Sequence, residues 1–154
     1  MYEGLLHLHN VLRWIILIFL LLSILRHLTA GNQPYGGKDK GFGLPLLIAT
    51  HVNAVIGIYQ WIAGAWGLTM IQQNGMGGVM KDSVTRFWAI EHPLMMLIAA
   101  ILITAGYGQR KSKHTARVQR RRAVIYYILA LIVILLAVPW PFREVIGRPL
   151  FPGM

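Results

Sequence analysis

Four long apolar stretches alternate with short polar connections along this chain. Each is close to the ~20 residues that an α-helix needs to cross ~30 Å of hydrocarbon. Pro45 lies at the start of the second stretch, where proline suits a first helical turn, and Pro139 with Pro141 ends the fourth. The pattern predicts membrane-spanning helices at residues 5–28, 44–68, 87–107 and 123–140.

The connections carry the residues typical of turns. Gly, Asn and Pro are frequent in residues 31–37, and Gly, Gln and Asn in residues 73–78. No internal repeat and no second domain is visible. We therefore expect a single transmembrane domain over residues 1–154, folded as an all-α, four-helix up-and-down bundle. The first stretch is not expected to be a signal peptide, because Glu3 stands where basic residues are needed and no cleavage site follows.

Composition supports a membrane protein and excludes several kinds of site. Only 13% of the residues are charged, although the net charge is +10; a soluble domain carries about twice that charged fraction. The basic residues lie between the apolar stretches, so we expect them to meet anionic membrane lipid and not nucleic acid. The absence of cysteine excludes disulfides, c-type haem attachment and thiolate metal sites.

Lysine and arginine are unevenly shared between the two sides of the predicted bundle. The first and third connections hold ten of the 15 basic residues, seven of them between Arg110 and Arg122. The positive-inside rule places these connections in the cytoplasm. We expect a multi-pass protein of the bacterial inner membrane with both termini outside, and a basic 110–122 loop that acts as a topological anchor.

Chemistry is expected at the polar residues that the predicted spans retain. An ionisable group inside a bilayer costs roughly 2.5–3.5 kcal/mol on insertion scales, so each needs a reason. The fourth span has none and is expected to be a wall of the bundle. The candidates are His7, His9, Asn10, Arg13, His51, Asn53, Gln60, Glu91 and His92.

Depth indicates which of the histidines can meet. A rise of ~1.5 Å per residue puts His9 about 10 Å and His92 about 6 Å from the midplane on the periplasmic side, and His51 about 7 Å on the cytoplasmic side. The first and third helices run parallel and are expected to face each other diagonally. Two neutral imidazoles at one level suit the iron of a b-type haem. We predict haem b on His92 and His9, with His7 as the alternative ligand.

The surroundings of these histidines fit a haem. Arg13 shares a face with His9 and suits a haem propionate, and Met96 is one turn from His92 and suits the ring edge. Ala99 and Gly106 leave a low strip for a flat ring or for close helix packing. The structural alternatives are an interfacial helix end capped by the histidines and an arginine that only extends to the interface beside Trp14.

The second stretch has a line of small and amide residues. They suit a hydrogen-bonded helix interface or a groove for a quinone or second cofactor. His51 points roughly the opposite way and has no partner at its depth, so no second bis-histidine haem is expected. The line is Asn53, Gly57, Gln60, Gly64 and Gly67, and the candidate second site is His51, Asn53 and Gln60.

Four segments resemble, in the same order, the small four-helix bacterial membrane proteins labelled cytochrome b-like. They are HLHNVLRW at residues 7–14, THVN at 50–53 with Gly57, RFWAIEH at 86–92 and VPWPFR at 138–143. The resemblance implies a haem-binding membrane protein. The family tends to have glutamine where Asn53 stands and no proline where Pro93 stands.

Two functions from different classes follow. The first is a b-haem electron-transfer subunit of a larger respiratory complex, which passes electrons from a quinol to a periplasmic acceptor while Glu91 takes a proton. The second is a cofactor-free accessory or assembly subunit that packs its small-residue faces against a larger membrane complex. A minor third possibility is a copper-handling protein that uses His7, His9, Met95 and Met96. No hydrolytic triad, phosphate loop or transporter repeat is visible, so a non-catalytic subunit is expected more than an enzyme.

Overall fold

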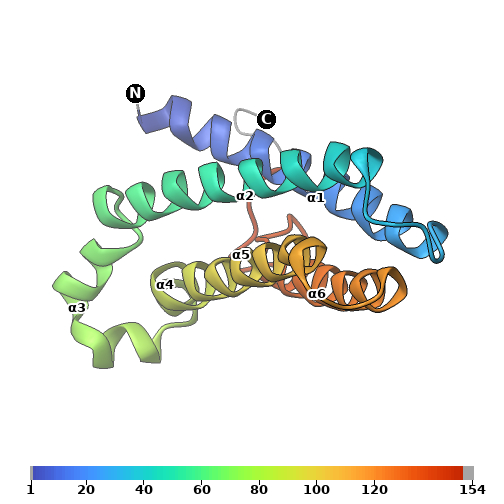
Figure 1. Cartoon of the computed structure of the whole chain (residues 1–154). Coiled ribbons are helices and arrows are strands. Elements are labelled where there is room, and N and C mark those ends of the chain that lie inside the picture. The colour runs from blue at the N-terminus through green and yellow to red at the C-terminus, as the bar shows by residue number, and fades with distance from the viewer. Residues whose placement is uncertain (1, 151–154) are drawn as a thin grey trace.

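The computed structural model describes residues 2–150, and within that range it contains helices and no strand (Figure 1). This confirms the all-α prediction. In chain order the elements are α1 (Tyr2–Thr29), α2 (Gly37–Ala63), α3 (Leu68–Lys81), α4 (Ser83–Arg86), the π-helical η1 (Phe87–Glu91), α5 (His92–Gly108), the 3₁₀ turn η2 (Gln109–Lys111) and α6 (Ala116–Ala137).

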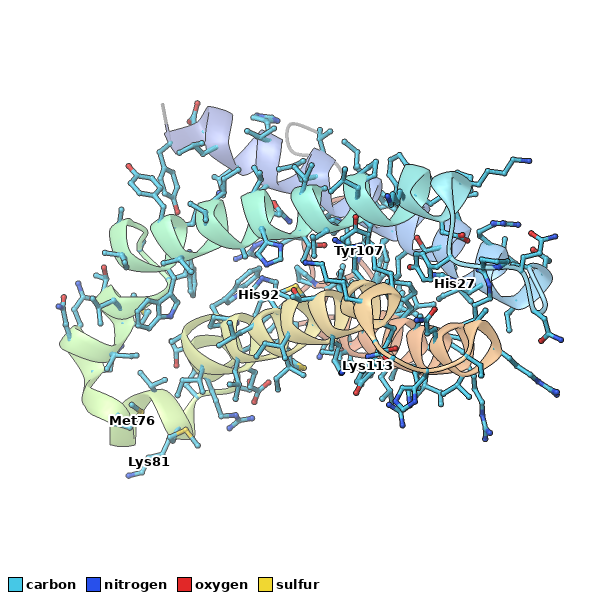
Figure 2. All side chains as sticks on the ribbon, in the orientation of Figure 1. His27, Met76, Lys81, His92, Tyr107 and Lys113 are labelled. Carbon is cyan, nitrogen blue, oxygen red and sulfur yellow. The ribbon has the colours of Figure 1, made fainter. Side chains whose placement is uncertain are left out.

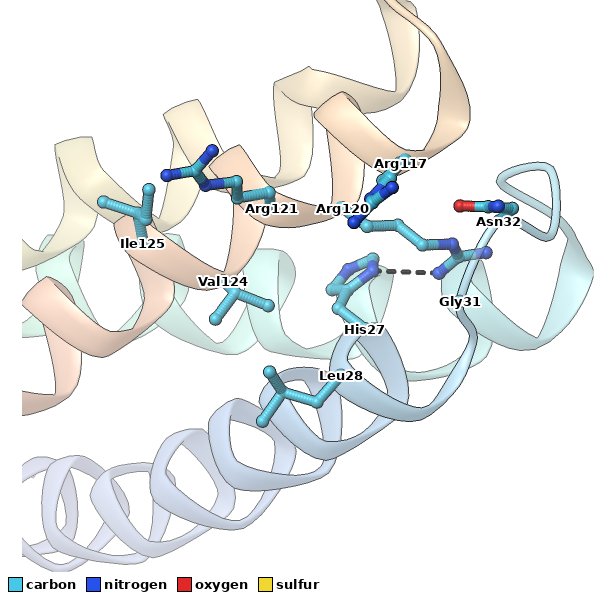
Figure 3. Close-up of a pocket in the computed structure, with 9 residues that line it drawn as sticks. All are labelled: His27, Leu28, Gly31, Asn32, Arg117, Arg120, Arg121, Val124 and Ile125. Atoms are coloured by element: carbon cyan, nitrogen blue, oxygen red, sulfur yellow. Dashed lines mark hydrogen bonds between the residues drawn. The ribbon is translucent and has the colours of Figure 1, made fainter.

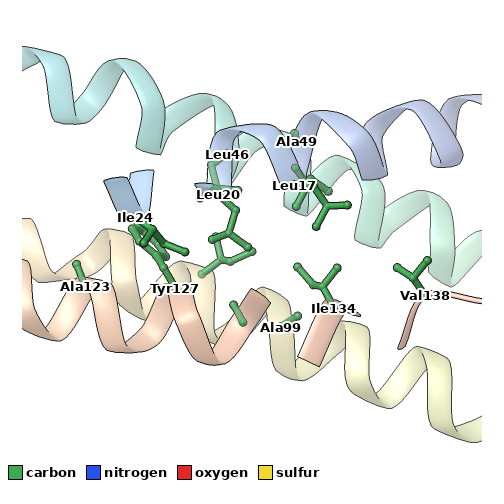
Figure 4. Packing of buried hydrophobic residues seen from close by; sticks show 13 residues of the cluster. Leu17, Leu20, Ile24, Leu46, Ala49, Ala99, Ala123, Tyr127, Ile134 and Val138 are labelled. Atoms are coloured by element: carbon green, nitrogen blue, oxygen red, sulfur yellow. The ribbon is translucent and has the colours of Figure 1, made fainter. Parts of the chain in front are cut away.

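The four long helices pack side by side around a common core. α1 packs on α2 and α6, and α5 packs on the same two helices, so α1 and α5 occupy diagonal positions as expected. Figure 1 shows α1 and α2 in one layer above α5 and α6, with α3 at one side. The core is aliphatic except for one ring (Figure 4); its largest side chains with no exposed surface are Leu20, Leu46, Ile103 and Tyr127.

Three helical segments of the described chain are long and apolar enough to cross a membrane: Tyr2–Thr29, Gly37–Ala63 and Ser83–Lys111. The fourth helix is different because α6 carries four arginines in its first seven residues. Its remaining part, residues 123–137, is about 22 Å long at 1.5 Å per residue, and it ends before Pro139 as the prolines predict.

The predicted start of the second span is wrong. α2 begins at Gly37, and Pro45 lies inside the helix and not in its first turn. The reason is Asp39, whose Oδ2 accepts a 2.6 Å hydrogen bond from the Gly36 backbone N–H and so caps the helix. Burial of the same carboxylate extends the helix across a glycine- and lysine-rich segment that the sequence alone assigns to a loop.

The predicted end of the second span is also wrong. α2 stops at Ala63, and Gly64 is its C-cap residue. The 73–78 segment, predicted as a loop, belongs mostly to the separate helix α3. Gly75 interrupts α3 with a φ of +66°, a value that glycine adopts without steric cost.

The helix that precedes His92 is widened. Residues Phe87–Glu91 form a π-helical turn, a feature that is frequent at functional sites. Pro93 has no N–H, so the Ala89 carbonyl lacks its usual helical partner. Trp61 of α2 supplies one, since its Nε1–H donates to the Ala89 oxygen at 2.8 Å. The donor that is missing at Pro93 is therefore replaced by a contact between two helices.

The other end of the molecule is held by a buried ion-pair network. Asp39 accepts hydrogen bonds from Arg120 at 2.8 and 3.1 Å and from Arg26 at 3.1 Å. Arg120 also donates to Nδ1 of His27 at 3.1 Å. The network joins α2, α6 and α1. Burial raises the pKa of the adjoining Tyr35 phenol to about 12.

Candidate functional site

His92 lies at the first residue of α5 and is half-buried (Figure 2). Its Nδ1 is 2.9 Å from the backbone carbonyl of Ala137, the last residue of α6. A carbonyl only accepts, so Nδ1 carries the hydrogen and Nε2 keeps its lone pair in the neutral ring. Histidines that bind metals usually have this second hydrogen bond. The ring centres of Phe87 and Trp88 are 5.8 and 5.7 Å from the centre of the imidazole ring.

His9 of α1 approaches the same region from across the bundle. It packs against α2 at Gly57, where an added Cβ would lie 3.3 Å from His9 Cε1. Such a distance is tighter than ordinary van der Waals contact, so the missing side chain of Gly57 provides the space for the ring. The structure thus places His9 between α1 and α2, and a site that it shares with His92 stays a prediction.

Several buried polar atoms near this end have no hydrogen-bond partner among residues 2–150. Native structures pair the large majority of buried polar atoms, so each exception needs an explanation. Asn53 is only 8% exposed, and Gln60 lies two turns further along the same face of α2. The unpartnered atoms of this group are His9 Nδ1, Asn10 Oδ1, Arg13 Nε, Asn53 Oδ1, Gln60 Nε2 and Trp88 Nε1.

Arg13 is one turn from His9 and has two contacts of its own. Its Nη2 donates to the backbone carbonyl of Leu150 at 2.8 Å, and its guanidinium lies 5.2 Å from the Trp14 ring centre. The segment after α6 therefore returns to the start of α1. The guanidinium has a neutral acceptor here, and the predicted propionate contact stays a prediction.

The other predicted site residues differ in their exposure and contacts. His7 is exposed on α1, whereas Met96 is half-buried and packs on the hydrophobic core. Glu91 pairs with Arg86 at 2.7 Å, and its side chain is 40% exposed. Within residues 2–150, no group of three or more His, Asp or Glu side chains is arranged to hold a metal ion.

His51 lies outside this region. It is exposed, its Nδ1 is 2.8 Å from the Leu47 carbonyl, and its Nε2 is 3.4 Å from Thr104 Oγ1. Thr104 is twelve residues beyond His92 on α5, which corresponds to about 18 Å along a helix. The separation agrees with the depths expected for His51 and His92.

The small-residue strip on α5 does not leave room for a flat ring at its far end. An added Cβ at Gly106 would lie 2.6 Å from Tyr127 Cε1, and Ala99 is part of the packed core. The strip therefore serves close packing between α5 and α6, the second of its two predicted roles. The tyrosine was missed because its contact depends on how two helices pair.

Sequence reasoning also missed the acceptor for His92, which comes from a residue 45 positions away. Pro93 is the only local signal for the widened turn, and it does not identify Trp61 as the compensating donor. Comparisons of the chain with models of protein families, with curated proteins and with solved structures found no match. The resemblance to cytochrome b-like proteins therefore stays a prediction from the residues.

Proposed function

We propose that the chain crosses the bacterial inner membrane four times, with both termini outside and with α6 as the fourth span. The two ends of the molecule differ in the way that the positive-inside rule and the interfacial preference of tryptophan require. Arg117, Arg120, Arg121 and Arg122 begin α6 at one end. At the other end, the ring centres of Trp14 and Trp140 are 6.3 Å apart. Trp61 contacts the turn that precedes His92, and Trp88 is part of that turn.

Labelling of single cysteines tests this orientation. Cysteine at position 113 is expected to resist a membrane-impermeant maleimide in intact spheroplasts and to react after lysis. Cysteine at position 76, in α3, is the matched control and is expected to react in both. Reaction of position 113 in intact spheroplasts would contradict the orientation.

We further propose that His9 and His92 bind one b-type haem near the periplasmic face. The observation that carries the proposal is the hydrogen bond from His92 Nδ1 to the Ala137 carbonyl. It fixes the tautomer with a free Nε2 lone pair, which is what an axial ligand needs. The unpartnered buried atoms of the region, among them His9 Nδ1 and Asn53 Oδ1, fit a polar group that binds there.

The chain's own residues prepare the site in three ways. α6 orients the His92 ring through Ala137, Gly57 gives the His9 ring its space, and Phe87 and Trp88 keep water from the imidazole. Arg13 offers its Nε, which has no partner among the described residues, to a propionate. When bound, a haem supplies reversible one-electron transfer.

The role that we propose is a b-haem electron-transfer subunit of a larger quinol-linked respiratory complex. Held by His9 and His92 near one face, a haem would supply electron exchange between a quinol in the bilayer and a partner outside it. Asn53 and Gln60 have unpartnered amide atoms that suit a quinone carbonyl or hydroxyl. Glu91, paired with Arg86 at the exposed edge of the site, is the candidate for a quinol proton.

The alternative, a cofactor-free accessory subunit, was expected to use its small-residue faces for docking. On α2 that face is turned inward at Gly57, which contacts His9. Gly64 and Gly67 lie beyond the end of α2 and are buried against Tyr2 and the Trp61 backbone. The outward face carries large aliphatic side chains, among them Val55 and Ile62. Small-residue docking on α2 is therefore not favoured.

The absorption spectrum of the purified protein tests the proposed function. The protein is produced with haem precursor in excess and reduced with dithionite. We expect a sharp b-type α-band and close to one haem per chain by pyridine haemochrome assay. Protein that is monodisperse but free of haem would overturn the proposal in favour of the accessory subunit.

A further inference from the structure

A groove opens between α1 and α6 at the end of the molecule opposite the histidine site (Figure 3). It has a volume of about 280 Å³. Arginines from the first turns of α6 line one part, and aliphatic side chains of both helices line the other. The residues that the argument uses are His27, Leu28, Arg117, Arg121, Val124 and Ile125.

Arg120 is the buried cation at the back of this groove, and its hydrogen bonds are made within the chain. Arg120 donates to both oxygens of Asp39 and to the carbonyls of Gln33 and Pro34. His27 is also saturated: Nδ1 accepts from Arg120, and Nε2 lies 3.0 Å from the Tyr35 hydroxyl. Neither side chain is available to a ligand. The positive charge offered by the groove must come from other residues.

Arg117 and Arg121 supply that charge. Both are exposed, and neither has an ion pair or hydrogen bond to any of residues 2–150. They are four positions apart on α6, so their side chains emerge on the same helix face. Like charges at this spacing repel each other. Asp39, the acid that the neighbouring Arg120 contacts, is already paired with Arg120 and Arg26. The pair is thus arranged for an anion that the chain does not supply.

The rest of the groove is suited to hydrocarbon. Leu28 is 61% and Ile125 47% exposed, and they lie on the two helices that form the groove. Val124 lies between them in the wall. Further along, Leu25 and Ile128 continue the exposed aliphatic surface toward the middle of the proposed span. A free phosphate would not contact this aliphatic surface, whereas an acyl chain would cover it.

We propose that this groove, which we call the Arg117–Arg121 groove, binds an anionic phospholipid of the cytoplasmic leaflet. The phosphate lies between the two guanidinium groups, which suit phosphate oxygens through paired N–H donors. An acyl chain lies along Leu28 and Ile125. Basic pockets between membrane helices on this side bind anionic headgroups in the same way. The proposal rests on the proposed orientation of the chain and does not depend on haem binding.

Native mass spectrometry of the full chain in detergent tests the proposal. The probes are phosphatidylglycerol and phosphatidylcholine with identical acyl chains, added as an equal mixture. We expect wild-type protein to bind phosphatidylglycerol in preference. A basic residue near the surface contributes about five-fold in affinity, so R117Q/R121Q is expected to weaken phosphatidylglycerol binding roughly thirty-fold.

The matched control is K111Q/K113Q, which removes the same charge from the connection just before α6, outside the groove. It is expected to keep the preference for phosphatidylglycerol. Equal losses in R117Q/R121Q and K111Q/K113Q would overturn the proposal in favour of general surface charge. Complete displacement of the lipid by millimolar inorganic phosphate would overturn it in favour of a free-anion site, and so would equal binding of both lipids by wild-type protein.

Discussion

His92 Nδ1 and the carbonyl oxygen of Ala137 are 2.9 Å apart, and this hydrogen bond joins the first residue of α5 to the last residue of α6. The two helices contact each other extensively along their lengths. An imidazole held in this way has one rotamer and one neutral tautomer. The proposed haem ligand is therefore oriented by the fold before any cofactor binds.

Removal of this imidazole is expected to abolish haem binding. In His92→Ala we expect the b-type α-band to disappear while the protein remains in the membrane, because one axial ligand is lost without a gap in the main core. His51→Ala is the matched control, since His51 is exposed and contacts Thr104, and it is expected to retain the spectrum. Full haem content in purified His92→Ala would show that the imidazole is not a ligand.

The choice between the two first-helix histidines gives a second prediction. His9 is packed against Gly57, whereas His7 is exposed. His9→Ala is expected to lose the haem, and His7→Ala is expected to keep it with little change in the spectrum. Quantitative haem assays on both purified variants distinguish them. Loss of haem in His7→Ala but not in His9→Ala would show that His7, and not His9, is the ligand.

Trp61 is expected to stabilise the widened turn. Trp61→Phe keeps the ring but leaves the Ala89 carbonyl without its donor. The expected cost is about 1 kcal/mol of unfolding free energy, as for other hydrogen bonds between membrane helices. Trp66→Phe serves as the control because Trp66 is 44% exposed and its indole N–H has no hydrogen bond within residues 2–150. Equal thermal stability of the two variants in detergent would contradict this account of the turn.

Asp39 is expected to be the most sensitive carboxylate of the chain. Asp39→Asn leaves the buried guanidinium of Arg120 without its counter-charge. Breaking such a pair costs about 3–5 kcal/mol, because an uncompensated charge stays buried. Asp82→Asn, at an exposed helix N-cap, is expected to cost well under half of that. Chemical denaturation in mixed micelles measures both, and similar losses in the two variants would contradict the network's role.

The parts of the fold that sequence could predict are those set by local pattern. The apolar runs located the long helices, and Pro139 located the end of α6. The start of α2 could not be predicted, because it depends on Asp39, whose ion pairs are with Arg26 of α1 and Arg120 of α6. The helix over residues 68–81 was missed because its glycines are typical of a loop.

The site divides in the same way. Helical rise alone separated His51 from His92, and the contact of His51 with Thr104 of α5 agrees with this separation. A similar depth for His9 and His92 stays a prediction. The Ala137 acceptor and the Trp61 donor could not be predicted, since each depends on which helices pair and in what register. Tyr127 fills the strip beside Gly106 for the same reason.

Electron paramagnetic resonance of the oxidised, purified protein tests the central claim most directly, because the signal reports the axial ligands of the iron. Ligation by His9 and His92 predicts a low-spin ferric signal of the bis-imidazole type in wild-type protein, with one such haem per chain. In His9→Ala and in His92→Ala this signal is expected to be lost. A wild-type signal that is high-spin, or low-spin with histidine and methionine as ligands, would contradict the claim.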